Sequence, residues 1–173
     1  NRVGTDAATA TQAVTQEDLT TSSNGAIVLT ATDITIGGGA SGAGLTASGS
    51  GNVYLSASTD DIDINANVDA GSGHITLLAT SGTLIQDADV LTSSTGTIDV
   101  EADAITFNDG DSTSTGSGNI RYKVTNAMSI GDITTTGDVS LIAADISDSG
   151  TTDTDVSADE LRINVTGTGG VGT

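Results

Sequence analysis

The carboxylates of this chain occur in groups, and they are the side chains whose spacing could support chemistry. The chain carries 23 Asp and Glu residues against 4 Lys and Arg, a formal net charge of -19. Calcium is held by about six to eight oxygen atoms, which acidic turns can supply. No group of carboxylates in this sequence has the spacing of an EF-hand loop. The candidate calcium ligands lie in two acidic stretches and are Asp109, Asp111, Asp153 and Asp155.

The same carboxylates have a second interpretation. Charged side chains on the outside of a β-fold keep it soluble and discourage lateral association between sheets. Paired carboxylates also hydrolyse glycosidic bonds, but an enzyme that acts on acidic sugars would usually need cations in its cleft. The chain has one histidine, His74, and no cysteine, so ligands for a transition metal and members of a nucleophilic triad are scarce. We therefore predict that the protein is not an enzyme and has no cofactor apart from the candidate calcium.

The few basic residues exclude some partners and indicate one local contact. Nucleic acid binding needs clustered Lys and Arg, which are missing here, and no apolar run is long enough to cross a bilayer. Arg121 and Lys123 flank Tyr122, so both would point outward from one strand. They are a candidate contact for an anionic glycan or an acidic neighbour, and an ordinary solvated pair is the competing interpretation. Asn164 begins an Asn-Val-Thr acceptor sequence for N-linked sugar.

An internal repeat indicates how these side chains are positioned. A glycine is followed by apolar residues two, four and six positions later, as in the sequence GNVYLSA of residues 51–57. The pattern recurs at intervals of 19 to 26 residues, and Asp replaces Gly in the last copy. The copies begin at Gly25, Gly51, Gly73, Gly96, Gly118, Gly137 and Asp159. Alternation with a period of two predicts short strands joined by polar turns, without helical spacing.

Strands of this kind could build either of two architectures. A sandwich of hairpins would need Asn-Gly or Asp-Gly steps between strands of equal length, and most repeats lack such a step. A constant repeat of about 22 residues matches one coil of a parallel β-solenoid. We therefore expect an all-β parallel β-helix of about seven coils of about 22 residues. Equivalent side chains would then form internal columns, one of which contains Leu29, Leu55, Leu77, Val100 and Leu141.

The domain organisation follows the repeat. Residues 25–173 are expected to form the solenoid, and residues 1–24 an N-terminal capping or inter-module segment. The Gly-rich stretches 37–44 and 108–118 are expected to be loops that bulge from the coil. The chain begins without Met, and VGT occurs near both of its ends, which favours a processed product or a module of a tandem array. An uncapped solenoid end is an unpaired sheet edge that can pair with another chain.

Three stretches carry a resemblance to known proteins. They are GNVYLSA with the DIDI that follows it, GTIDVEADAITF, and LIAADISDSG with VSADELRINVTGTGGVGT. These stretches resemble repeats of very large bacterial surface proteins, including filamentous-haemagglutinin-like adhesins and the giant repetitive extracellular proteins of aquatic bacteria. The resemblance covers most of residues 25–173. It implies a right-handed β-helix, an extracellular or cell-surface location and an adhesive or structural role, and it transfers no catalytic residue.

The function expected from the sequence is therefore structural or adhesive. Stacked β-coils would form a module of a secreted surface protein or an extracellular filament, and would associate end to end with copies of themselves or with neighbouring modules. The alternative is a module of an adhesin that binds a glycan or another ligand with the help of calcium. A carbohydrate-active enzyme is the most distant interpretation.

Overall fold

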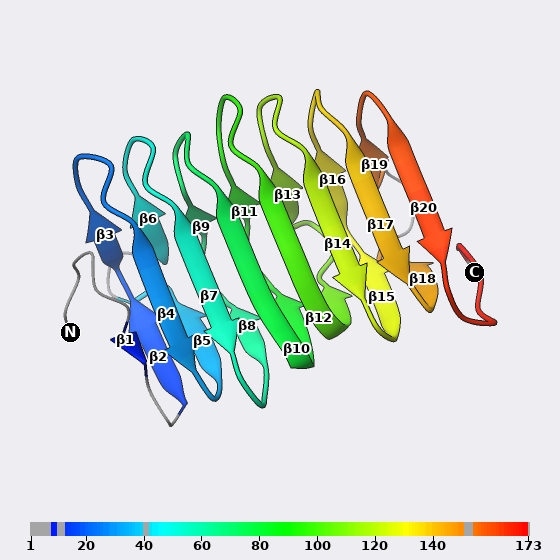
Figure 1. Ribbon diagram of the computed structural model, residues 1–173, viewed down its shortest axis with the longest axis horizontal. Helices are drawn as coiled ribbons and strands as arrows, with labels where there is room; N and C mark the ends of the chain where they lie inside the picture. The colour runs from blue at the N-terminus through cyan, green and yellow to red at the C-terminus, as the bar shows by residue number, and fades with distance from the viewer. Residues whose placement is uncertain (1–7, 10–12, 40–41, 151–153, 173) are drawn as a thin grey trace.

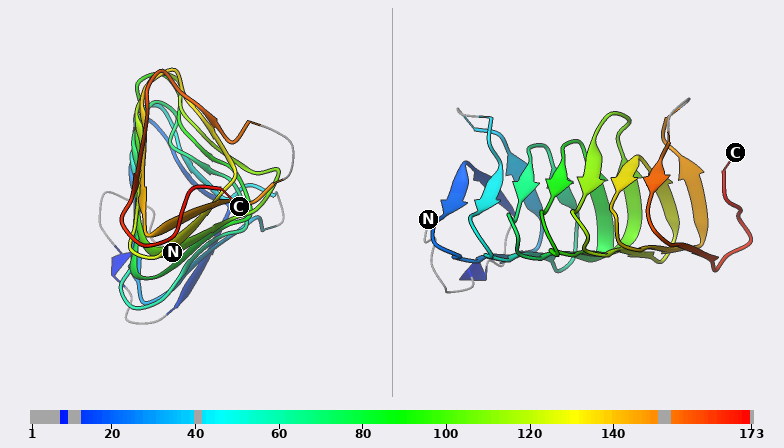
Figure 2. Two further views of the ribbon diagram at one scale, coloured as in Figure 1. Left: turned by 90° about the vertical axis from the view of Figure 1, so that its right-hand side faces the viewer. Right: turned by 90° about the horizontal axis from the view of Figure 1, so that it is seen from above.

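The structure of the protein, a computed structural model, describes residues 8–9, 13–39, 42–150 and 154–172. The strands cross the long axis of the molecule and are stacked side by side along it, from β1 near one end to β20 near the other (Figure 1). Viewed down that axis, the coils superpose as a triangle (Figure 2). The described residues form strands and no helix, so no described helix could cross a membrane. The predicted parallel β-solenoid of about seven coils is confirmed.

Each coil contributes strands to three faces, and every strand pair that joins successive coils is parallel. The first face follows the repeat glycine and contains β1 (Ala8–Thr9), β4 (Ile27–Ala31), β7 (Val53–Ala57), the first part of β10 (Ile75–Gln86), the first part of β12 (Ile98–Phe107), β14 (Ile120–Val124), β17 (Val139–Ala143) and β20 (Leu161–Val165). The second face contains β2 (Val14–Glu17), β5 (Ile34–Gly37), β8 (Ile62–Ile64), the later parts of β10 and β12, β15 (Ala127–Ile130) and β18 (Asp145–Asp148). The third face contains β3 (Leu19–Thr21), β6 (Leu45–Ala47), β9 (Val68–Asp69), β11 (Val90–Leu91), β13 (Ser112–Ser114), β16 (Asp132–Thr134) and β19 (Val156–Ser157).

The predicted internal columns are present. Along the first face, strand pairing places seven residues in one register column: Leu29, Leu55, Leu77, Val100, Tyr122, Leu141 and Ile163. All of them except Ile163 are buried. Burying an aliphatic side chain of this size contributes about 1.5–3 kcal/mol. Because each coil covers the one before it, the repeated alternation in the sequence becomes a continuous core.

The repeat begins with glycine because successive coils approach closely at that corner. A Cβ added to Gly51 would collide with the carbonyl oxygen of Gly25, and a Cβ on Gly73 would collide with that of Gly51. A Cβ on Gly96 or on Gly118 would likewise collide with the carbonyl oxygen of the repeat glycine one coil earlier. At Gly137 the nearest carbonyl oxygens are 2.7 and 3.0 Å from the position of a Cβ. In the coils that begin at Gly51 to Gly137, the first face therefore follows a residue that has no side chain.

The loop prediction for residues 108–118 is wrong at its centre. Ser112–Ser114 form β13, and Thr113 lies in register between Val90 and Ile133 in a column of the third face. Thr113 is fully buried, because its hydroxyl finds hydrogen-bond partners inside the core. In the other Gly-rich stretch, Gly37 ends β5, the described residues 38–39 and 42–44 belong to no strand, and residues 40–41 lie outside the described residues.

A polar cluster in the core explains how Thr113 is accommodated. The Thr113 hydroxyl lies 2.6 Å from the Tyr122 hydroxyl and 3.2 Å from Gln86 Oε1. The Gln86 amide nitrogen donates to the Ser112 carbonyl at 3.1 Å. Burial raises the pKa of Tyr122, and the hydrogen bond with Thr113 lowers it by a smaller amount, so the phenol stays protonated. Buried polar groups are tolerated when they are paired in this way.

Candidate functional site

The last coil differs from those before it because its inward side is not covered. β20 pairs with β17 along one edge, and no strand of the described chain pairs with its other edge. Leu161 and Ile163 continue the columns of Val139 and Leu141, yet they are 48% and 41% exposed. Val171, which forms a bridge with Ile146, is 57% exposed. These three residues and the open edge of β20 are named here the C-terminal end.

The backbone N–H of Leu161, at the C-terminal end, continues a series of donors that each bond to a carbonyl of the following coil. In six successive described coils, the residue two after the repeat position donates its N–H to a carbonyl of the next coil at 2.8 to 3.1 Å. These donor and acceptor pairs are Ile27 and Asn52, Val53 and His74, Ile75 and Thr97, Ile98 and Asn119, Ile120 and Asp138, and Val139 and Glu160. Leu161 is the next donor in this series, and the described chain has no later strand to accept its N–H.

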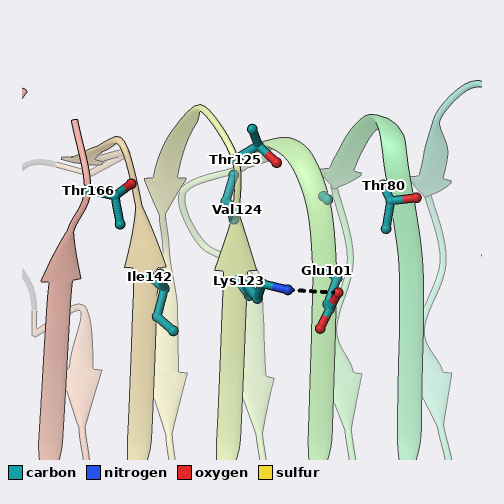
Figure 3. A pocket seen from close by; sticks show the side chains of 8 residues that line it. Thr80, Glu101, Lys123, Val124, Thr125, Ile142 and Thr166 are labelled. Carbon is teal, nitrogen blue, oxygen red and sulfur yellow. Dashed lines mark hydrogen bonds and ion pairs between the residues drawn. The ribbon is translucent and has the colours of Figure 1, made fainter.

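The predicted positive spot is an ion-pair network on the outside of the first face. Arg121 Nε is 2.7 Å from Asp99 Oδ1, and its Nη2 is 2.7 Å from Glu101 Oε1. Lys123 Nζ is 3.3 Å from Glu101 Oε2 (Figure 3). The hydrogen bond from Arg121 lowers the pKa of Glu101, and hydrogen bonds to Asp99 and Glu101 raise the pKa of Arg121. Because two carboxylates compensate two cations, an anionic glycan would have to compete with the preceding coil, and the predicted contact stays a prediction.

An open groove of about 450 Å³ lies beside this network, where the first face turns into the second (Figure 3). Its lining residues are Thr80, Glu101, Ala102, Lys123, Val124, Thr125, Ile142 and Thr166. Glycoside hydrolysis requires two carboxyl groups across the scissile bond. Glu101 is the one carboxylate among these lining residues, and it is already paired with Arg121 and Lys123.

The two acidic stretches that were predicted to hold calcium come close to one another at the corner between the second and third faces. A Cβ at Gly150 would lie 2.9 Å from Asp109 Oδ1, and the Gly150 N–H donates to Asp148 Oδ1 at 2.6 Å. Asp109 is exposed, Asp111 and Asp155 are half-buried, and Asp153 lies outside the described residues. The described residues contain no group of three or more carboxylate or histidine side chains arranged to hold a metal. Calcium binding therefore stays a prediction.

Burial and neighbouring carboxylates together raise the pKa of aspartates at two described positions. Burial, followed by the charges of Asp89 and Asp87, raises the pKa of Asp111. Burial, followed by the charges of Asp33 and three further aspartates, raises the pKa of Asp63. The Oδ1 atom of Asp63 is shielded from solvent and accepts no hydrogen bond from a described residue. At both positions, therefore, the folded chain disfavours the charged form of the carboxylate.

The one histidine and the candidate glycosylation site both lie on the outside of the first face. His74 is exposed, and its Nδ1 accepts the backbone N–H of Thr97 at 3.1 Å. This contact gives His74 a role in joining two coils. Asn164 is exposed on β20, in register with Ile142. An exposed side chain is compatible with an N-linked sugar, and that modification stays a prediction.

Comparison of the chain with protein-family models, with curated proteins and with solved structures gives no match. Leu161 and Ile163 stand two and four residues after Asp159, so the repeat predicts them inside the core, but both are exposed. Their alternation is the same as in the buried copies of the pattern, so it carries no signal for this exposure.

Proposed function

We propose that this chain is a structural or adhesive module of a secreted surface protein or an extracellular filament, extended end to end through its C-terminal end. The observation that supports this proposal is the position of the exposed large hydrophobic residues. In the described chain these are Leu161, Ile163 and Val171, and all three belong to the last coil. Exposed apolar residues beside an unpaired strand edge are typical of a surface that binds another strand.

The long sides of the solenoid are less suited to association than its last coil, which supports the same proposal. The outward positions of β12 carry Asp99 and Glu101, while its inward Ile98 and Val100 are buried and aliphatic. With a net charge of -19, copies of the chain repel one another along their sides. The chain contains no proline, so every residue of an edge strand can donate a backbone hydrogen bond. Association would therefore be directed to the ends and would lengthen the rod.

A ligand-binding module of an adhesin is the alternative, and one observation favours it. The Asp109 loop and the Asp148–Gly150 turn approach one another although about 40 residues separate them in the sequence. If calcium joined the two loops, it would increase the melting temperature, and a chelator would reverse the increase. If calcium has no effect on melting, this alternative loses its structural basis.

Sedimentation velocity over a range of protein concentrations tests the proposed function. The wild-type chain is expected to form species that grow with concentration and appear as rods in electron micrographs. The I163D variant is expected to stay monomeric and folded, because Ile163 is already 41% exposed. The matched control is T76D, which places the same charge on the outside of the first face, and it is expected to associate like the wild type. A wild-type chain that stays monomeric up to millimolar concentration, at low and high salt, would contradict the proposal.

A further inference from the structure

Side chains at the corners of the coils form hydrogen bonds that run in one direction along the axis. Asn52 Oδ1 accepts the N–H of His74 at 2.9 Å, and Asn119 Oδ1 accepts the N–H of Asp138 at 3.0 Å. The same arrangement joins Asn24 to Ser50, Asp61 to Thr83, Asn67 to Asp89, His74 to Thr97, Asp89 to Ser112, and Asp145 to Gly170. In each of these bonds the acceptor side chain belongs to the earlier coil and the donor N–H to the later one.

Hydroxyl groups at the corner before the repeat glycine follow the same direction. The Ser72 hydroxyl donates to the Gly49 carbonyl at 2.9 Å, and the Ser93 hydroxyl donates to the Gly71 carbonyl at 2.9 Å. Ser117 and Thr136 donate in the same way to Ser94 and Gly116. The Gln86 side chain in the core has the opposite arrangement, because it belongs to the earlier coil and donates to the Ser112 carbonyl of the later one. On its outer surface, therefore, a coil presents acceptors toward the C-terminal end and donors toward the N-terminal end.

This direction determines what the C-terminal end offers to a partner. Glu160 lies in the corner column of Asn52, His74 and Asn119, one residue after the repeat position, and its carboxylate can only accept. A second C-terminal end would bring Glu160 against Glu160. Such contact between like charges is unfavourable.

The described strands of the N-terminal coil have open edges that face the other way along the axis. β1, β2 and β3 pair with β4, β5 and β6, and their other edges have no partner strand in the described chain. Ser22, which is exposed, lies three residues before a repeat glycine, as Ser93 does. The two sheets of the solenoid end in β20 and β19 at one end and in β1 and β3 at the other. A second copy placed in the same orientation would add β1 to β20 and β3 to β19.

We infer that the C-terminal end binds the N-terminal coil of a second copy of this chain, head to tail and in parallel register, and does not pair with another C-terminal end. The inference rests on the proposed end-to-end association and adds its partner and its direction. The interface repeats the coil-to-coil contact that is formed between neighbouring coils within the chain, with Leu161 and Ile163 covered by the incoming coil. Head-to-tail contacts of this kind do not close, so the product is an open filament.

Disulfide capture between two single-cysteine variants tests the direction. The chain has no cysteine of its own. The internal register of the third face places Thr46 against Thr20 and Ser157 against Thr134, so head-to-tail stacking places Thr20 of one copy against Ser157 of the other. Both side chains are exposed, and paired strands hold Cα atoms within the 4.4–6.8 Å that a disulfide needs. The T20C and S157C proteins are mixed under mild oxidation at a concentration at which the wild type associates.

The expected result is a mixed T20C–S157C dimer that forms at least tenfold faster than either homodimer. The matched control is S114C, which lies on the same face two coils earlier, and it should give no mixed dimer with T20C. If S157C homodimers form fastest while sedimentation shows association, the direction is wrong and the proposed function stands. If neither disulfide capture nor association occurs, both the inference and the proposed function fail.

Discussion

Leu141 and Ile163 are neighbours in one column of the solenoid, and they have opposite environments. Leu141 is 0% exposed because β20 covers it, whereas Ile163 is 41% exposed because no described strand covers β20. The same alternation of aliphatic residues therefore produces a core inside the rod and an exposed apolar surface at its last described coil. What distinguishes the two environments is the presence of a following coil.

The N-terminal coil provides a second comparison. Its inward positions include Gln16, in register with Ile36, and Thr21, in register with Ala47. Thr21 is buried, and its hydroxyl donates to the Gly25 carbonyl at 2.5 Å. The described part of this coil is thus more polar on its inward side than the last coil. The described parts of the two end coils are therefore chemically different.

The largest expected effect distinguishes an interior position from the end of the same column. Leu55→Ala should lower the free energy of unfolding by about 2–5 kcal/mol, because it leaves a cavity in a covered column. Ile163→Ala should cost less than about 1 kcal/mol in the monomer, since the side chain is already partly in water. Urea unfolding at a concentration below association measures both. Equal losses at the two positions would contradict the distinction.

A smaller effect is expected at the buried polar cluster. Tyr122→Phe removes the hydroxyl that pairs with Thr113, and should lower the free energy of unfolding by about 1–2 kcal/mol. Tyr54, half-buried on the outside of the first face, is the control, and Tyr54→Phe should change stability by less than about 0.5 kcal/mol. Thermal melting of the two variants provides the comparison. A neutral Tyr122→Phe would show that the cluster is not needed to keep Thr113 in the core.

The acidic outer surface gives a pH-dependent prediction. Asp63 has a raised pKa in the folded chain, so its contribution to stability is fully present below the unfolded pKa and is lost as the pH rises through the folded pKa. Asp63→Asn should therefore raise the melting temperature at pH 7 by roughly 1–3 °C. Near pH 3 the gain should disappear, because Asp63 is then protonated in both states. A gain that is equal at both pH values would assign the effect to packing.

The smallest effect is expected at the ion-pair network. Arg121 and Lys123 side chains are 37% and 54% exposed, and exposed ion pairs contribute about 0–1 kcal/mol. Arg121→Gln should cost more than Lys123→Gln, because Arg121 contacts two carboxylates. Glu101 has a lowered pKa, so the contribution of the network is present above the unfolded pKa and is lost as the pH falls through the folded pKa. Melting curves at low and high salt should show the Arg121→Gln cost shrinking with salt.

The solenoid could be predicted from the sequence because its core uses one simple rule in each coil. Glycine followed by alternating aliphatic residues locates the first face, and strand pairing confirms those columns. Gln86 and Thr113 could not be predicted, since polar residues interrupt the alternation. Their burial depends on hydrogen bonds between residues 27 positions apart in the sequence. A pattern read along one strand does not contain that information.

The site was only partly predictable for a related reason. Alternation correctly placed Arg121 and Lys123 on the outer surface, but it did not show that Asp99 and Glu101 neutralise them from the preceding coil. A spacing of 22 residues does place Asp99 beside Arg121 once the coil length is known. The direction of the corner hydrogen bonds required coordinates, because Asn, Asp and Ser have similar roles in any turn.

Hydrogen exchange at the backbone of β20 tests most directly the claim that the C-terminal end is where the chain associates. The N–H of Val139 is bonded to the Glu160 carbonyl at 2.8 Å, and the N–H of Leu161 holds the equivalent place one coil later. At low concentration we predict slow exchange at Val139 and fast exchange at Leu161. At a concentration that supports association, Leu161 should become protected as well. If the protein associates while Leu161 continues to exchange rapidly, the contact lies elsewhere and the account is contradicted.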